Sequence, residues 1–129
     1  MSIWKSKTSV EKKPWGKIIN ISTPFGMSGK IIHLRKNQRN SLKYYKHLNQ
    51  ALYCFSGKIL VMAPKEKEFG DIINKDLGAT FEIVPGELIL IQSENPYRLV
   101  AIEDSVLVEV LLGRTSGHSI MLDDDYGRV

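Results

Sequence analysis

Hydrophobic and polar residues alternate along most of the chain, in short runs that end at turn-forming residues. Apolar side chains at every second position, or in continuous runs of four to eight residues, are typical of β-strands. No long stretch has the 3.6-residue period of an amphipathic helix. The pattern predicts strands at Lys17–Ser22, Lys30–Arg35, Leu42–His47, Ala51–Phe55, Lys58–Ala63, Thr80–Val84, Glu87–Gln92, Arg98–Ala101 and Ser105–Leu112.

Turn signals such as "KNQRN", "SGK", "VPGE" and "SENP" separate these strands at regular intervals. Many short, evenly spaced strands indicate an antiparallel sandwich or barrel. The segment Pro64–Asp76 is expected to be a polar hairpin or loop, and the chain after Gly113 is expected to be irregular. We therefore predict one all-β domain over residues 1–129, with an N-terminal arm (1–13) and a C-terminal tail (113–129).

The composition agrees with a single globular domain. The chain has 129 residues, of which 43% are hydrophobic and 25% charged. No apolar run approaches the roughly 20 residues that cross a bilayer, and the first 15 residues lack the apolar core of a secretory signal. The single cysteine, Cys54, has no internal partner and is compatible with a reducing compartment. We therefore predict a cytoplasmic protein without a membrane partner.

The formal net charge of +4 raises the question of nucleic-acid binding. The basic residues are scattered, with loose concentrations at Lys5–Lys17 and Lys30–Lys46, and no nucleic-acid recognition pattern accompanies them. The charge therefore favours a solvated basic face, or a pocket for a small anionic molecule, over a nucleic-acid partner.

Several motifs carry a resemblance to a known superfamily. The order of an "SG" turn, a long loop, "PGE" and "NPY" resembles the cupin superfamily, whose members are jelly-roll β-barrels. In addition, "KKPWGK", "GKIIHLRKNQRNSLKYYKH" and "LDDDYGR" resemble the cupin domain of type II mannose-6-phosphate isomerases, which is often fused to mannose-1-phosphate guanylyltransferases. The resemblance implies a cupin-type jelly-roll β-barrel and a function connected with sugar phosphates.

The same resemblance implies that the metal site of the family is degenerate here. The family pattern would place glutamine, histidine and glutamate at Lys43, Tyr45 and Gln50, and a later histidine at Tyr97. Only His47 is still a good ligand, whereas zinc, iron and manganese need several anionic or imidazole donors at one point. We therefore predict that the protein holds no metal cofactor, a divalent metal being the less favoured alternative.

Strand alternation places Ser41, Lys43, Tyr45 and His47 on one face, which the family pattern turns toward the barrel interior. These side chains would supply a cation, a phenol and an imidazole. We predict His47, Tyr45 and Tyr97 as candidate catalytic residues, and Lys43, Gln50 and Arg39 as candidate ligand-binding residues.

A buried lysine needs an anion, so Lys43 is expected to meet either a ligand or an internal carboxylate. The candidate carboxylates across the barrel are Glu87, Glu94, Glu103 and Glu109.

A second resemblance leaves the function open. The run "NQALYCFSGKILV" is similar to a strand of sugar-nucleotide 3,4-ketoisomerases, which are metal-free cupins that move protons with histidines. Arg39 fits that family's motif, but Lys43 and Tyr45 stand where its two histidines would be. His47 and a tyrosine could still form a proton-transferring pair.

Three functions follow from these residues and resemblances. The domain binds, and in the enzymatic version isomerises, a sugar phosphate or related anionic molecule. Alternatively it is a non-catalytic binding or interaction module, whose tyrosines fill the former metal site and bond to Gln50 or His47. A third hypothesis is a metal-free sugar-nucleotide isomerase or epimerase. Because cupins of this kind often pair through barrel strands and sheet edges need to be covered, we also expect a homodimer.

Overall fold

The computed structural model describes residues 3–24, 28–64, 77–113 and 119–127. Within these ranges the chain forms eleven β-strands and no helix. The strands are β1 (Ser9–Lys13), β2 (Gly16–Ser22), β3 (Ser28–Leu34), β4 (Leu42–Tyr45), β5 (Leu48–Ser56), β6 (Ile59–Pro64), β7 (Leu77–Ile83), β8 (Leu88–Ile91), β9 (Arg98–Ala101), β10 (Ser105–Gly113) and β11 (Ser119–Asp123).

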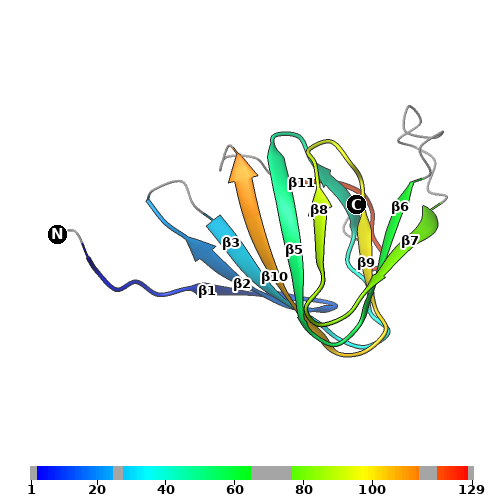
Figure 1. Ribbon diagram of the computed structural model, residues 1–129, viewed down its shortest axis with the longest axis horizontal. Helices are drawn as coiled ribbons and strands as arrows, with labels where there is room; N and C mark the ends of the chain where they lie inside the picture. Colours follow the sequence, from blue (N-terminus) through cyan, green and yellow to red (C-terminus); the bar gives the residue numbers. More distant parts are fainter. Residues whose placement is uncertain (1–2, 25–27, 65–76, 114–118, 128–129) are drawn as a thin grey trace.

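Six strands form one large sheet in the order β1-β2-β3-β10-β5-β8, and every neighbouring pair is antiparallel. Figure 1 shows this sheet fanning out from β1 on the left to β8. Strand β10 lies at its centre, paired with β3 on one side and β5 on the other. Segments far apart in the sequence therefore meet side by side in this layer.

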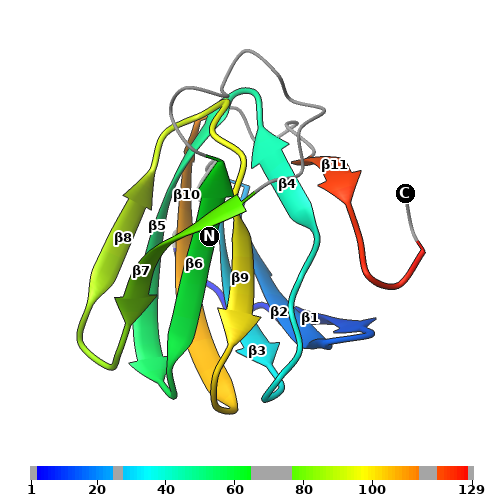
Figure 2. The same ribbon diagram turned by 90° about the vertical axis from the view of Figure 1, so that its right-hand side faces the viewer.

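The second layer consists of β7-β6-β9 and the pair β11-β4, both antiparallel. Two isolated bridges, Arg39↔Val100 and Lys43↔Tyr97, join β4 and the segment before it to β9 and the residue that precedes β9. Figure 2 shows β6, β7 and β9 facing the viewer, with β4 and β11 beside them. The two layers enclose the interior of an all-β jelly-roll barrel, as the strand pattern predicted.

The core lies between the layers because inward and outward residues alternate along each strand. On β5, Gln50, Leu52 and Cys54 point inward and are at most 5% exposed, whereas the alternate residues Tyr53 and Phe55 are exposed. Leu107 on β10 is also completely buried. Burying such apolar side chains contributes about 1.5–3 kcal/mol each to folding.

The turn from β5 to β6 requires a glycine. Gly57 has a φ of 86°, and a Cβ atom there would lie 2.2 Å from the Ser105 hydroxyl oxygen. The "SG" turn therefore owes its glycine both to the backbone conformation and to the close approach of the segment that leads into β10.

The predicted strands are confirmed, with small shifts at their ends, but the prediction lacked two strands. Ser9–Lys13 forms β1 inside the predicted arm, and Ser119–Asp123 forms β11 inside the tail that was expected to be irregular. Strand β4 ends at Tyr45 and not at His47. The predicted loop Pro64–Asp76 lies outside the described residues beyond Pro64. None of the described residues forms a helix long and apolar enough to cross a membrane.

Candidate functional site

A pocket opens between the β1–β3 side of the large sheet and the β4–β11 pair, with a volume of about 270 Å³. We call it the basic pocket, because three lysines and one carboxylate are the charged side chains among its described lining residues. These are Lys13, Lys30, Lys43 and Glu11. The rest of the wall includes Tyr45 and the polar residues Asn40, Ser41 and Ser119.

Tyr45 is the centre of this pocket. The Lys30 ammonium donates a hydrogen bond to the Tyr45 hydroxyl at 3.1 Å and lies 5.7 Å from the ring centre. The Lys43 ammonium lies 5.9 Å from the same centre. Both cations are therefore within the distance at which an aromatic face attracts a positive charge. Strands β3 and β4, from opposite layers, hold these groups together.

The charge states of this pair follow from its surroundings. Burial lowers the pKa of the Lys30 ammonium, but the Tyr45 phenol and the Glu109 carboxyl group outweigh burial, so the pKa is raised overall. Burial and Glu109 raise the pKa of Tyr45, against the opposing effect of Lys30. At neutral pH the pocket therefore presents a lysine cation and a neutral phenol.

The rim of the pocket holds Glu11, the one carboxylate among the described lining residues, in an ion pair. Glu11 Oε2 lies 2.6 Å from Lys13 Nζ, and Glu11 Oε1 accepts a longer bond from the Asn20 amide at 3.4 Å. The bond from Lys13 lowers the pKa of Glu11 against the opposing effect of burial. Glu11 thus pairs with Lys13 at the rim, whereas Lys30 and Lys43 lie beside Tyr45.

Deeper in the barrel, Gln50, Tyr97 and Glu109 form a buried polar cluster. They are 5%, 2% and 1% exposed. The Gln50 amide nitrogen donates to the Tyr97 hydroxyl at 2.7 Å and to Glu109 Oε1 at 2.9 Å. Burial first, and then Glu109, raise the pKa of Tyr97 well above its usual value. One oxygen, Glu109 Oε2, is buried without a hydrogen-bond partner.

The cluster and the pocket are adjacent along the sheet. Lys30 on β3 and Glu109 on β10 are direct cross-strand partners. No ion pair joins these two side chains among the described contacts, so their attraction acts over a longer distance. Glu109, one of the four carboxylates considered for Lys43, therefore faces the interior next to Lys30.

The buried polar cluster does not fit a transition metal. The cluster supplies one carboxylate, one amide and one phenol, and no imidazole or thiolate belongs to it. The Tyr45 hydroxyl already accepts a hydrogen bond from the Lys30 ammonium, which places a positive charge beside it. Among the described residues, no group of three or more histidine, cysteine, aspartate or glutamate side chains converges as metal ligands would.

A second, mainly apolar hollow reaches Tyr97 from the other side of the barrel. It lies between β6, β7 and β8, with a volume of about 460 Å³. Its described walls include Val61, Phe81, Ile89 and Ile91. Tyr97 therefore stands between an apolar hollow and the polar cluster, which suits a side chain with an apolar ring and a polar tip.

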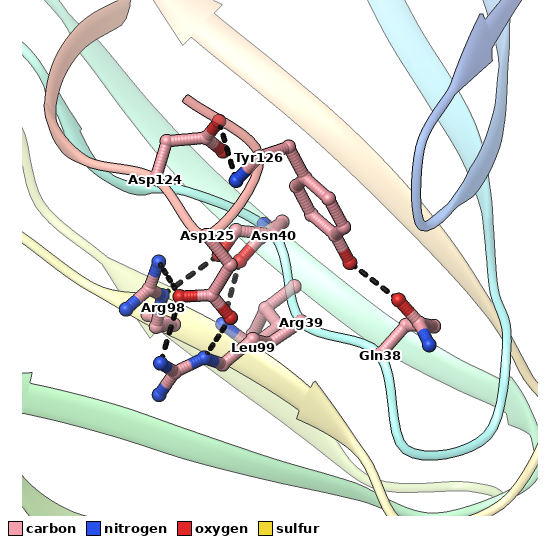
Figure 3. Close-up of polar contacts among 8 residues, drawn as sticks. All are labelled: Gln38, Arg39, Asn40, Arg98, Leu99, Asp124, Asp125 and Tyr126. Atoms are coloured by element: carbon pink, nitrogen blue, oxygen red, sulfur yellow. Dashed lines mark hydrogen bonds and ion pairs between the residues drawn. The ribbon is translucent and has the colours of Figure 1, made fainter. Parts of the chain in front are cut away.

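A C-terminal anchor holds the chain that follows β11. Asp125 lies between Arg39 and Arg98 (Figure 3). Both of its carboxylate oxygens accept hydrogen bonds from Arg39, with 2.7 Å between Arg39 Nη2 and Asp125 Oδ1. The same Oδ1 lies 3.5 Å from Arg98 Nη2. The Tyr126 hydroxyl donates to the Gln38 side chain at 2.6 Å. Asp125 and Tyr126 thus bond the chain after β11 to Gln38 and Arg39, which precede β4, and to Arg98 on β9.

The structure brings together part of the predicted site. Lys43 and Tyr45 line the basic pocket, and Gln50 and Tyr97 share the buried cluster. The predicted bond between the Tyr97 hydroxyl and Gln50 is confirmed. The expectation that His47 points inward is wrong, because β4 ends at Tyr45 and His47 lies exposed in the turn before β5.

Arg39 is the other residue that the structure places elsewhere. Its guanidinium bonds Asp125 in the C-terminal anchor, outside the described walls of the basic pocket. The sequence prediction assigned no site role to Lys30, which bonds Tyr45, or to Glu109 as the partner of Gln50. A charged residue at an inward position of an otherwise apolar strand, as in "KIIHL" and "VLVEV", is the signal that could have found both.

Comparison with known proteins identifies the fold. No protein-family model and no curated protein sequence matches the chain. A variant of oxalate decarboxylase from Bacillus subtilis is similar in structure, with a TM-score of 0.72 and 16% identity over 89% of this chain. Another solved structure of that protein is described by its Mn(II) centres. The coconut allergen cocosin has a TM-score of 0.71 and 16% identity over 90% of this chain.

A third similar structure is the 11S globulin from Wrightia tinctoria, described as having an auxin binding site, with a TM-score of 0.70 and 12% identity over 90% of this chain. The match covers only 29–31% of the length of these three proteins. At such low identity the similarity shows the fold alone. The chain has the cupin-type jelly-roll fold.

Proposed function

We propose that this cupin domain binds a small, polar, anionic molecule of the sugar-phosphate class in the basic pocket. The observation that carries the proposal is the convergence of two ammonium groups, from Lys30 and Lys43, on the ring of Tyr45. A phosphate or carboxylate placed between them would accept charge-assisted hydrogen bonds. The resemblance of three sequence motifs to the cupin domain of mannose-6-phosphate isomerases supports the same class of ligand.

The size and lining of the pocket favour a monosaccharide derivative. Its volume of about 270 Å³ is at the lower end for ligand pockets, which run from about 300 to 1,000 Å³. A sugar nucleotide is larger than this pocket can enclose. Asn40, Ser41 and Ser119 offer amide and hydroxyl groups that suit sugar hydroxyls. The basic pocket thus combines a cationic wall for the anionic group with polar walls for the sugar.

Binding is supported better than catalysis. Aldose–ketose isomerisation needs a base to remove a proton from carbon. Lys30 and Tyr45 both have raised pKa values and hold their protons at neutral pH, and His47 lies exposed in a turn. The pocket therefore offers hydrogen-bond donors and positive charge, and we propose a metal-independent binding domain over an isomerase or a sugar-nucleotide epimerase.

Calorimetry with mannose 6-phosphate tests the proposal, with mannose and inorganic phosphate as separate titrants. We expect the phosphorylated sugar to bind and mannose alone to bind far more weakly. Lys30→Met and Lys43→Met should each weaken binding about 10- to 150-fold, because a hydrogen bond to a charged group contributes about 1.5–3 kcal/mol. Lys17→Met, which removes an exposed lysine on the outer side of the large sheet, is the matched control and should bind normally.

Two further measurements keep the alternatives apart. Elemental analysis and a chelator titration on the same preparation should show no metal requirement for binding. Nuclear magnetic resonance of the sugar in the presence of the protein should show no conversion to the ketose. Affinity that is equal in Lys30→Met and Lys17→Met would overturn the basic pocket as the site, and turnover lost in Tyr45→Phe would establish the isomerase alternative.

A further inference from the structure

The outer side of the large sheet has a hollow of its own, at the end of the sheet where β1 turns into β2. Its volume of about 570 Å³ lies within the range of about 300–1,000 Å³ that ligand pockets have. We call it the outer hollow. Of its described lining residues, only Lys13 also lines the basic pocket. The two are therefore separate cavities.

A single row of cross-strand partners forms much of the wall of the outer hollow. The row runs from β1 through β2, β3 and β10 to β5. In that order, its members are Lys12, Lys17, His33, Val106 and Ser56. Their sequence neighbours Ile18, Ile32 and Leu107 are at most 5% exposed, so the row itself faces outward.

The sheet bends where this row reaches β5. Val106 pairs with Ser56, but the next residue on β10, Leu107, pairs with Cys54. Phe55 is therefore an extra residue on β5, and such a β-bulge bends its strand and increases the local twist. The shape of the backbone thus contributes to the hollow together with the side chains around it.

Positive charge is concentrated in the part of the row that lies on β1 and β2. Lys12 and Lys17 are both exposed and stand directly opposite each other. Like charges in this position destabilise a sheet. Among the ion pairs of the described residues, none involves either lysine. The pair therefore costs stability in the unliganded protein, and an anion bound between the two ammonium groups would offset their repulsion.

Two further charged groups of the hollow are held in place by the backbone. The Arg35 guanidinium donates to the Pro14 carbonyl oxygen, and the Arg35 backbone N–H donates to that of Trp15 at 2.9 Å. The remaining N–H donors of the guanidinium form a planar fork that suits a phosphate. Asp104, the one carboxylate among the described lining residues, accepts a bond from the Lys36 backbone N–H at 2.7 Å.

We propose that the outer hollow binds a small molecule through an oligophosphate group, such as the triphosphate of a nucleotide. Neighbouring strands lie about 4.8 Å apart, so Lys12, Lys17 and His33 follow one line that is roughly 10 Å long. A chain of phosphates contacts several of these groups at once, whereas a single phosphate does not. Each contact to a lysine is then a charge-assisted hydrogen bond.

The uncharged end of the row favours a small molecule over a nucleic-acid strand. Val106 and Ser56 continue the row on β10 and β5 without adding charge. A nucleic-acid strand is held by a basic groove that follows its backbone over several nucleotides. Here, Val106 and the aliphatic stems of the lysines would instead contact the apolar part of a molecule of nucleotide size.

Calorimetry at low ionic strength tests the proposal, with ATP, AMP and inorganic triphosphate as separate titrants. ATP and triphosphate should bind on the order of 10-fold more tightly than AMP, because each exposed ion pair contributes up to about fivefold. Lys12→Met/Lys17→Met should weaken the binding of ATP to a similar extent. Lys7→Met/Lys46→Met, which removes two exposed lysines outside the hollow, is the matched control and should bind ATP normally.

The His33 imidazole gives a local readout by nuclear magnetic resonance. Burial, and then Lys17, lower the pKa of His33. The charged residues that line the hollow with it are Lys12, Lys13, Lys17, Arg35 and Asp104. Bound triphosphate favours the imidazolium form, so the pKa of His33 should rise on binding. Triphosphate should accordingly bind more tightly as the pH falls through that pKa.

The same titrants identify the source of the phosphate chain. Equal affinities for ATP and inorganic triphosphate would assign recognition to the phosphates alone, and tighter binding of ATP would assign it to a nucleotide. The site is independent of the proposed function. Lys30→Met should lose mannose 6-phosphate binding and keep ATP binding, whereas Lys12→Met/Lys17→Met should do the reverse.

Three results would overturn the proposal, with circular dichroism to confirm that each variant is folded. Equal affinity for ATP in Lys12→Met/Lys17→Met and in Lys7→Met/Lys46→Met would exclude the outer hollow as the site. Binding of ATP no tighter than that of AMP would exclude recognition of an oligophosphate group. An RNA oligonucleotide that binds more tightly than ATP through the same lysines would exclude a small molecule as the ligand.

Discussion

The basic pocket and the buried polar cluster lie side by side in one barrel, yet they differ in access to solvent and in internal bonding. In the pocket, Lys30 is only partly buried and its bond to Tyr45 borders open space. In the cluster, Gln50 bonds both Tyr97 and Glu109 within the core. Hydroxyl groups of two tyrosines thus have different roles, one toward a potential ligand and the other toward the fold.

The comparison shows that the interior of one barrel can hold two polar sites with different surroundings. The position at which the resembled family would hold a metal is filled by Gln50 and Tyr97, bonded to each other. Positive charge is supplied next to it by lysine side chains from both layers. We infer that the polar interior has been divided into a structural part and a binding part.

The largest expected effect comes from breaking the buried polar cluster. Gln50→Leu leaves the Tyr97 hydroxyl and Glu109 Oε1 without their donor. At about 1–3 kcal/mol for each buried group left unsatisfied, the free energy of unfolding should fall by about 2–6 kcal/mol. Urea denaturation measures the change directly.

A double substitution separates lost hydrogen bonds from altered packing. Gln50→Leu/Glu109→Leu removes the donor together with the carboxyl group that needs it, and also removes the buried Oε2 that has no partner. Replacing both partners by apolar groups of similar shape is close to neutral in stability. The double variant should therefore be more stable than Gln50→Leu. A further loss would contradict the structural role of the cluster.

A matched pair of tyrosine substitutions gives the next largest effect. Tyr97→Phe should cost about 1–3 kcal/mol of stability, because it removes the buried hydroxyl that accepts a bond from Gln50. Tyr45→Phe should cost less than about 1 kcal/mol, since water in the pocket can replace the bond to Lys30. Thermal unfolding of both variants, with ligand titration of each, measures the contrast. A larger loss of stability in Tyr45→Phe than in Tyr97→Phe, together with loss of ligand binding in Tyr97→Phe, would contradict the roles assigned to the two tyrosines.

Much of this architecture is predictable from the sequence, because strand alternation and turn residues act locally. The predicted strand Arg98–Ala101 agrees with β9 at both ends, and the "SG" turn lies where Gly57 has a positive φ. β1 was missed because "SVEKK" has too few apolar residues to show a strand period, and pairing with β2 stabilises it as an edge strand. β11 was missed for a related reason, since it depends on pairing with β4.

The site was harder to predict because its members come from strands far apart in the sequence. Gln50 and Glu109 are 59 residues apart and meet because β5 and β10 are neighbours in the sheet. Lys30 and Tyr45 meet across the two layers. His47 was assigned to the interior by extending alternation two residues past the end of β4. Periodicity indicates which way a strand residue points, but not where the strand ends.

The smallest expected effect concerns the C-terminal anchor, which follows the strand β11 that forms one wall of the basic pocket. Asp125→Asn weakens the contacts to Arg39 and Arg98 and should cost at most about 1 kcal/mol, because the pair is partly exposed. The bond from Arg39, and then Arg98, lowers the pKa of Asp125. The stabilisation is therefore present above the unfolded pKa near 4 and is lost as the pH falls through the lower folded value.

Urea denaturation at neutral and acidic pH, with Glu103→Gln as a control that removes an exposed carboxylate elsewhere, tests this dependence. The stability difference between the wild-type protein and Asp125→Asn should shrink as the solution is acidified below about pH 4. Hydrogen exchange should quicken in β4 and β11, which line the pocket, and stay unchanged in β5 and β10, which hold the cluster. A local loss of the anchor can loosen the pocket wall only if that wall opens independently of the core. Equal acceleration of exchange in all four strands would therefore show that the basic pocket and the buried polar cluster unfold as one cooperative unit.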